Sequence, residues 1–171
     1  WVNGGDIKGD RDIELFCELG KIFKKITPDN LVTFHPFGRN TSSTWFHQED
    51  WLDFNMFQSG HRRYDQASLG TWDDNPISGE YFGEDNWKYV ERDHGMAPLK
   101  PTIDGEPSYE NVPQGLHDPT QPSWKACDVR RYAYWSVFAG AMGHTYGHGS
   151  IMQFYNDLAD KGAYGLDVLW Q

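Results

Sequence analysis

The chain has 171 residues, a formal net charge of −10, and hydrophobic and aromatic fractions of 38% and 16%. This amount of apolar side chain is enough for one packed domain, and so many aromatic residues are not typical of intrinsic disorder. The acidic balance, with no run of Lys or Arg, argues against nucleic acid as a partner, and no apolar run reaches the roughly 18 residues of a membrane span. The chain begins "WVNGGD", without an initiating Met, so the absence of a visible leader decides nothing about location.

Short apolar segments alternate with longer helical ones along the chain. Apolar, β-branched and aromatic runs that end in Gly, Pro or His predict strands at 1–6, 31–36, 52–61, 99–107 and 143–150. Helical spacing of apolar residues predicts helices at 11–25, 84–93 and 123–143. A shorter helix is expected to follow an N-cap at Ser42 or Ser43, and the final "DVLWQ" (167–171) is expected to begin a further helix.

Alternating strands and helices are typical of an α/β fold with parallel strands, because parallel neighbours need a crossover that is usually helical. The glycine patterns of nucleotide-binding folds and the GxSxG of esterases are missing from the sequence. Polar residues instead gather near the ends of the expected strands, where (β/α)₈ barrels carry their functional groups: Asp6, His35, His61, Asp104, Glu106, His144 and His148. A complete barrel needs about 250 residues, so we expect residues 1–171 to form one partial barrel that lacks roughly the first three strands.

Two carboxylates on facing strand ends are what cleavage of a glycosidic bond requires, and we select Asp6 and Glu106. Asp6 follows two glycines, where the backbone can approach a ligand closely, and Glu106 precedes Pro107, which stiffens the local backbone. Asp104 lies two residues before Glu106, and the two acids are expected to do different work. The alternative for Asp6 is an ordinary turn or helix cap.

The histidines and cysteines give no firm metal site. His144 and His148 are four residues apart, which on a helix would suggest a metal site, but the glycines around them favour a strand or turn. There the two side chains would share one face that points into the mouth of a barrel, for sugar binding or support. Cys17 and Cys127 are expected to be buried free thiols, although a disulfide between them stays open. No metal or other cofactor is expected.

Five segments together resemble the apiosidase-like glycoside hydrolases, that is, glycoside hydrolase family 140 and its relatives. The resemblance runs in order from Trp1 to about Phe154 and rests on "WVNGGD", "TFHPFGRNTSSTWF", "WLDFNMFQSGH", "KPTIDGEPSYE" and "DVRRYAYWSVFAGAMGHTYGHGSI". It implies the part of a (β/α)₈ barrel from the fourth to the eighth strand. It also implies a secreted or periplasmic enzyme that acts on plant cell-wall glycans such as pectin side chains.

The resemblance also implies roles for individual residues. The family's catalytic acid falls on Asp6 and its second carboxylate on Glu106. The residues that would line the sugar site are His35, His61, Tyr109, Tyr146 and His148. The remaining wall of the site would come from the rest of the same protein.

The expected activity is therefore that of a glycoside hydrolase with Asp6 as acid/base and Glu106 as nucleophile. Carboxyls about 5–5.5 Å apart would give retention of the anomeric configuration, and about 6.5–9.5 Å would give inversion. Two alternatives stay open: a carbohydrate-binding or pseudo-enzyme module that holds sugar without cleaving it, and a structural piece of a larger assembly.

Overall fold

The computed structural model describes residues 1–63, 65–66, 84–116 and 118–152. The further helix expected at 167–171 lies outside these residues. No helix within them is long and apolar enough to cross a membrane. The elements in chain order are β1 (Val2–Ile7), η1 (Gly9–Arg11), α1 (Ile13–Ile26), β2 (Thr33–Pro36), β3 (Asn40–Thr41), α2 (Ser43–Phe46), β4 (Asn55–Gln58), α3 (Trp87–His94), β5 (Thr102–Asp104), α4 (Ala126–Phe138), β6 (Gly143–His144) and α5 (Gly149–Met152).

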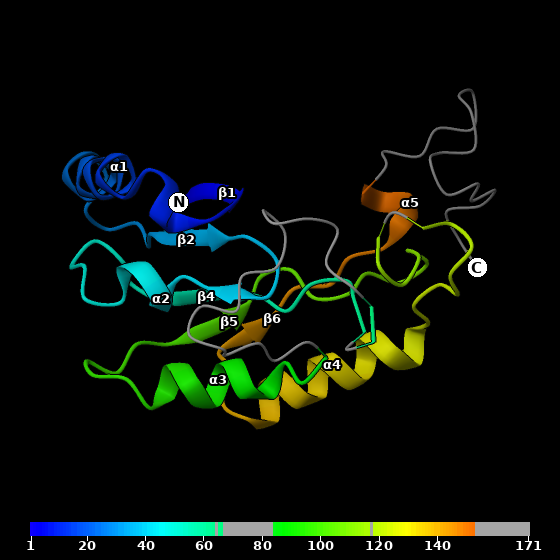
Figure 1. Cartoon of the computed structure of the whole chain (residues 1–171). Helices are drawn as coiled ribbons and strands as arrows, with labels where there is room; N and C mark the ends of the chain where they lie inside the picture. Colours follow the sequence, from blue (N-terminus) through cyan, green and yellow to red (C-terminus); the bar gives the residue numbers. More distant parts are fainter. Residues whose placement is uncertain (64, 67–83, 117, 153–171) are drawn as a thin grey trace.

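Five of the strands, β1, β2, β4, β5 and β6, lie side by side in chain order (Figure 1). β1 pairs with β2 in parallel, and β4, β5 and β6 form a second parallel series. β2 lies next to β4, because Thr33 Oγ1 donates to the carbonyl of Phe54 at 2.8 Å and Asp53 N donates to the carbonyl of Val32 at 2.9 Å. Parallel strands joined through helices confirm the α/β class that the alternation of elements predicts.

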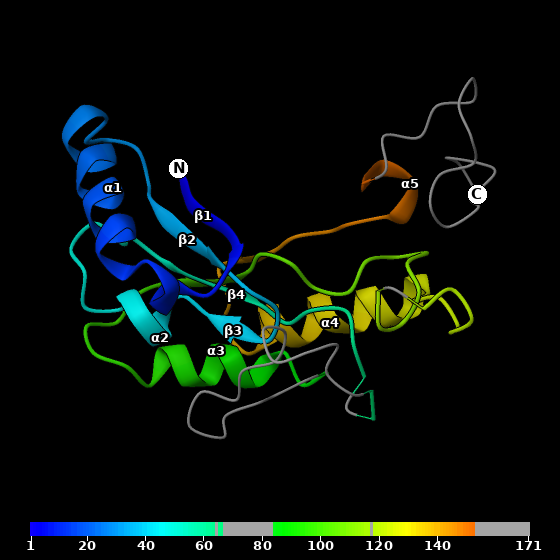
Figure 2. The ribbon, with the colours of Figure 1, turned by 45° about the horizontal axis from the view of Figure 1, so that its top comes forward.

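The helices lie on two sides of the strands. α1 runs along β1 and β2, whereas α3 and α4 pack together against β5 and β6 (Figure 2). Gly20 lets α1 pack closely against the ring of Trp51, since a Cβ on residue 20 would lie 2.2 Å from that ring. Buried side chains form two clusters. The cluster beneath α1 consists of Phe16, Val32, Phe34, Phe46, Trp51 and Leu52. The cluster beneath α3 consists of Phe57, Tyr89, Val90 and Ala141.

Several elements differ from the expectation. The first strand was expected to be buried, yet Asn3 is its only buried residue and Val2 is 55% exposed, because β1 is an edge strand that pairs only with β2 among the described residues. The last expected strand is only two residues long and is followed by α5. The short strand β3, antiparallel to β4, was not expected at all. Both cysteines are free, but Cys17 is half-buried and Cys127 is exposed.

Candidate active site

The candidate site is built at the carboxyl ends of the parallel strands. Asp6 lies near the end of β1, His35 lies in β2, His61 follows β4, and Glu106 follows β5. Asp6 has a φ of 50°, which non-glycine residues rarely adopt. Such backbone conformations cluster at functional sites, where the surrounding structure enforces them. Here the backbone N–H of Asp6 donates to Nδ1 of His35 at 3.0 Å.

Two histidines hold the carboxylate of Glu106. Nε2 of His35 lies 3.1 Å from one oxygen, and Nε2 of His61 lies 3.0 Å from the other. Because Nδ1 of His35 accepts the N–H of Asp6, its ring proton sits on Nε2, which donates to Glu106. Both oxygens of Glu106 are thus fixed by groups from different strands. His35 and His61, expected to line a sugar site, contact the second carboxylate directly, and their sugar contacts stay a prediction.

The two carboxyls of the site have opposite shifts in pKa. Burial raises the pKa of Glu106, but the hydrogen bonds from His35 and His61 outweigh this and lower it to about 2. Burial raises the pKa of Asp6, and the negative charge of Glu106 raises it further, against a hydrogen bond from Gln58. Glu106 is therefore held ionised while Asp6 keeps its proton to higher pH. This is the division that acid/base chemistry with two carboxyls needs.

Tyr109 lies among the acids. Its ring packs edge-on against His61, with ring centroids 4.7 Å apart and an interplanar angle of 72°. Burial raises the pKa of Tyr109, and the negative charges of Glu106, Asp104 and Asp6 add to the effect. The structure brings Tyr109 to the same site as the two proposed catalytic carboxyls, and its contact with substrate stays a prediction.

Tyr146 and His148 lie in the segment after β6. The hydroxyl of Tyr146, which is 57% exposed, donates to Glu110 at 2.9 Å. Nδ1 of His148 accepts the N–H of Ser150 at 3.1 Å, and Nε2 pairs with Asn111 at 3.0 Å. Both ring nitrogens of His148 are thus used within the protein, and the roles expected of these two residues in sugar binding stay predictions.

The expectation that His144 and His148 share one strand face is wrong. β6 ends at His144, so His148 lies beyond the strand. The side chain of His144 is only 8% exposed, and its Nδ1 is 4.0 Å from Asp104. Among the described residues, no group of three or more His, Cys, Asp or Glu side chains is arranged to hold a metal ion.

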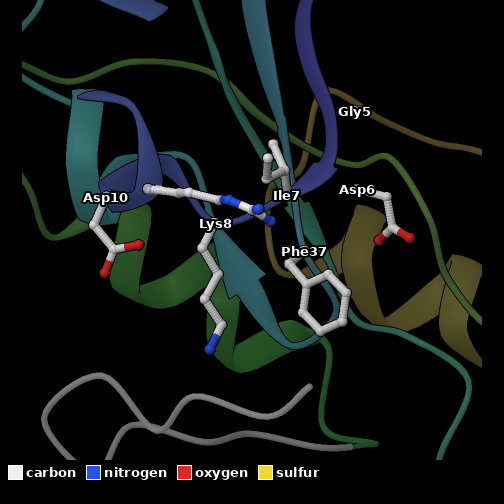
Figure 3. Close-up of a pocket in the computed structure, with 7 residues that line it drawn as sticks. Gly5, Asp6, Ile7, Lys8, Asp10 and Phe37 are labelled. Carbon is white, nitrogen blue, oxygen red and sulfur yellow. The ribbon is translucent and has the colours of Figure 1, made fainter. Parts of the chain in front are cut away.

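A pocket of about 470 Å³ opens beside Asp6 (Figure 3). In the figure, Asp6 and Lys8 lie on opposite sides of the Phe37 ring. The pocket is lined by two basic side chains, Lys8 and Arg11, and by two acidic ones, Asp6 and Asp10. The spacing of apolar residues did not predict this pocket, because Lys8 and Arg11 reach it only after the chain turns from β1 into η1.

Gln58 is a functional candidate that the sequence did not single out, whereas Asp104 was named as a strand-end acid without a defined role. Gln58 is the last residue of β4 and is 4% exposed, and it hydrogen-bonds the Asp6 carboxyl. Asp104 is wholly buried behind Glu106. The weak indication in the sequence was a polar residue at the end of an apolar run, which is also common at structural turns.

The contacts of His35 and His61 with Glu106 predict a change in the free energy of unfolding that occurs only at acidic pH. Glu106 has an ordinary pKa of 4.5 and a folded value of about 2, so its ionised form stabilises the fold fully above pH 4.5 and loses this contribution as the pH falls toward 2. The size is roughly 3 kcal/mol. In urea denaturation of the full-length protein, we expect Glu106→Gln to lose less free energy of unfolding than the wild type over this pH range. If the free energy of unfolding depended on pH equally in the two proteins, the stabilising role of these contacts would be contradicted.

Comparisons with known proteins place this geometry in context. A family model described as "Apiosidase-like, catalytic domain" matches residues 1–171. A solved structure titled "Glycoside hydrolase" is 56% identical, with a TM-score of 0.89, over 99% of this chain and 37% of its own. A second, titled as a glycoside hydrolase family 5 protein from Bacteroides vulgatus ATCC 8482, is 52% identical, with a TM-score of 0.82, over 98% of this chain and 34% of its own. The chain thus spans little more than a third of the length of these structures. No curated protein matches it.

Proposed function

Since the chain belongs to the apiosidase-like catalytic-domain family, we propose that the protein is a glycoside hydrolase with Asp6 and Glu106 as its catalytic carboxyls. The observation that carries this proposal is the pair of histidines on Glu106, with an acid of raised pKa at the end of β1. A module that only binds sugar has no need of two carboxyls whose pKa values are shifted in opposite directions.

The proposed reaction is a double displacement with retention. Asp6 donates its proton to the glycosidic oxygen while Glu106 attacks the anomeric carbon and the bond to the leaving group breaks. Water, deprotonated by Asp6, then releases the sugar from Glu106. An inverting enzyme would need Glu106 to take a proton from water. A carboxylate with a pKa of about 2 is a poor base for that work, which favours its use as the nucleophile.

We further propose that these strands are the fourth to eighth of a (β/α)₈ barrel completed by the rest of the same protein. Their parallel order supports this, as do apolar side chains on outer surfaces. Leu15, Ile22 and Ile26 on α1 are 55%, 45% and 71% exposed, and Phe138 at the end of α4 is 82% exposed. Such surfaces commonly pack against a partner. A secreted or periplasmic location remains part of the same proposal.

The substrate we propose is an acidic plant cell-wall glycan of the pectin type. Lys8 and Arg11 line the pocket beside Asp6, where a carboxylate on the leaving group could meet them.

Replacing both basic residues tests this preference. In Lys8→Ala/Arg11→Ala, we expect kcat/KM on a uronic-acid glycan to fall about 10-fold or more, because hydrogen bonds to a charged group are lost. Activity on the corresponding neutral glycan should change by less than about twofold. Equal losses on both glycans, measured by reducing-sugar release, would remove the acidic preference.

The proposed function is tested with the full-length protein on a panel of pectic polysaccharides and neutral glycans. We expect release of monosaccharides or short side chains, and proton NMR of the first product should show the anomeric configuration of the substrate. An inverted product would reassign Glu106 as a base. Binding without release from any glycan would favour the carbohydrate-binding alternative.

A further inference from the structure

A buried polar cluster lies directly behind the proposed nucleophile. Asp104, the last residue of β5, is 0% exposed. Its carboxylate accepts hydrogen bonds from the hydroxyl of Ser59 at 2.8 Å, the N–H of Ser59 at 3.5 Å and the amide of Asn86 at 3.1 Å. The backbone N–H of Glu106 also hydrogen-bonds to it. Buried carboxylates need such partners, and here the partners come from three separate parts of the chain.

These partners belong to the segments that carry the site. Ser59 is two residues before His61, and Glu106 is two residues after Asp104. The same two segments are joined by backbone bonds, from Gly60 N to the carbonyl of Glu106 at 3.1 Å and from Gly105 N to the carbonyl of Phe57 at 2.8 Å. The carboxylate of Asp104 therefore links the segment after β4 to the segment after β5. The same two segments carry His61 and Glu106, which hydrogen-bond to each other.

The groups behind Asp104 are polar but neutral. Asn86 also donates to the hydroxyl of Ser136 at 2.7 Å and to the carbonyl of Tyr132 at 2.9 Å, which ties the cluster to α4. His144 is the titratable group on β6 that faces Asp104, and burial lowers the pKa of His144 to about 4. Burial raises the pKa of Asp104 to about 7. The hydrogen bonds that Asp104 accepts, rather than a salt bridge, therefore hold it in place.

We propose that Asp104 is a positioning residue that sets the distance between His61 and Glu106 and thereby the aim of the nucleophile. This inference rests on the proposed function, since it concerns the same reaction. Asp104 touches neither substrate nor reacting atoms in this role. It acts through the backbone of Ser59 and Glu106, and a displacement of about 1 Å at a reacting group can cost on the order of 100-fold in rate.

The chain offers a matched control in Asp93. Asp93 lies in α3, is also 0% exposed, and accepts hydrogen bonds from the hydroxyls of Thr41, Ser43 and Thr102, the nearest at 2.6 Å. Burial raises its pKa as well. Its partners lie in β3, in α2 and at the start of β5, away from His61 and Glu106. Asp93→Asn therefore removes a comparable buried charge without touching the strand ends of the site.

The kinetic test compares Asp104→Asn with Asp93→Asn in the full-length protein, per folded molecule. We expect Asp104→Asn to lower kcat about 10- to 100-fold with KM within about twofold, because positioning is lost and binding is not. Asp93→Asn should keep kcat within about twofold while lowering the melting temperature. A double-mutant cycle should show Asp104→Asn and His61→Ala to be non-additive, and Asp93→Asn and His61→Ala to be additive. Equal kcat losses for the two Asn variants, or additivity in both cycles, would overturn the proposal.

A second measurement does not depend on activity. Hydrogen exchange of the backbone amides can be followed by mass spectrometry. In Asp104→Asn, the peptides from residues 57–61 and those from residues 104–108 should both exchange faster than in the wild type. In Asp93→Asn, exchange in these two segments should be unchanged. If Asp104→Asn does not fold, Ser59→Ala removes one donor alone and should give a smaller change in the same peptides. Unchanged exchange at both strand ends would overturn the inference. A wild-type protein that cleaves no glycan but shows this pattern would contradict only the proposed function.

Discussion

Glu106→Gln is expected to lower kcat on the best glycan substrate by on the order of 10⁴- to 10⁶-fold, the loss typical of removing a nucleophile. The amide is nearly isosteric: its oxygen can still accept the hydrogen bond from Nε2 of His35, and its NH2 can donate to Nε2 of His61 in that histidine's other tautomer. The fold and substrate binding should therefore persist. It cannot form the glycosyl ester that a retaining reaction passes through. The measurement is single-turnover and steady-state sugar release, with Kd for the same glycan measured by calorimetry.

The matched control for Glu106→Gln is Glu18→Gln. Glu18 lies on α1 with its side chain 68% exposed and forms a local ion pair with Lys21. The same chemical change there should leave kcat and KM within about twofold, since exposed pairs contribute little. Near-normal turnover by Glu106→Gln would remove it as the nucleophile, whatever the behaviour of the control.

Asp6→Asn should produce a loss that depends on the leaving group. On natural glycans, whose leaving oxygen needs a proton, kcat should fall about 10²- to 10⁴-fold, the usual contribution of a general acid. On aryl glycosides with acidic phenol leaving groups, formation of the glycosyl-enzyme should proceed almost unchanged, because such groups depart without protonation. An added nucleophile such as azide should then accept the sugar from the glycosyl-enzyme and restore turnover, because azide needs no general base.

The pH profile gives a second readout for Asp6. Its pKa is raised by burial and by the charge of Glu106, and catalysis requires its protonated form. Activity of the wild type should therefore fall as the pH rises through this pKa, and Asp6→Asn should lack that alkaline limb. Asp29→Asn, an exposed acid in the turn after α1, serves as control. Equal losses on natural and activated substrates would count against a proton-donating role for Asp6.

Much of this protein could be predicted from local patterns. Hydrophobic periodicity placed the helices and parallel strands because an apolar face must be buried whatever the rest of the fold does. The glycines before Asp6 and the Gly and Pro around Glu106 marked both acids as strand-end residues. The resemblance of the quoted segments then predicted the family to which the chain belongs.

Tertiary structure alone decided what the polar residues do. His61 meets Glu106 across 45 residues of sequence, and Asp6 meets His35 across 29. No local periodicity reports such contacts, so two expected sugar-binding histidines proved to hold a carboxylate. For the same reason His144 could not be paired with Asp104 in advance, nor Lys8 and Arg11 with the pocket beside Asp6. Sequence determines which surfaces must be buried and which chemical groups are present. Only the packed chain sets their distances, and those distances determine the direction in which the pKa of each acid is shifted.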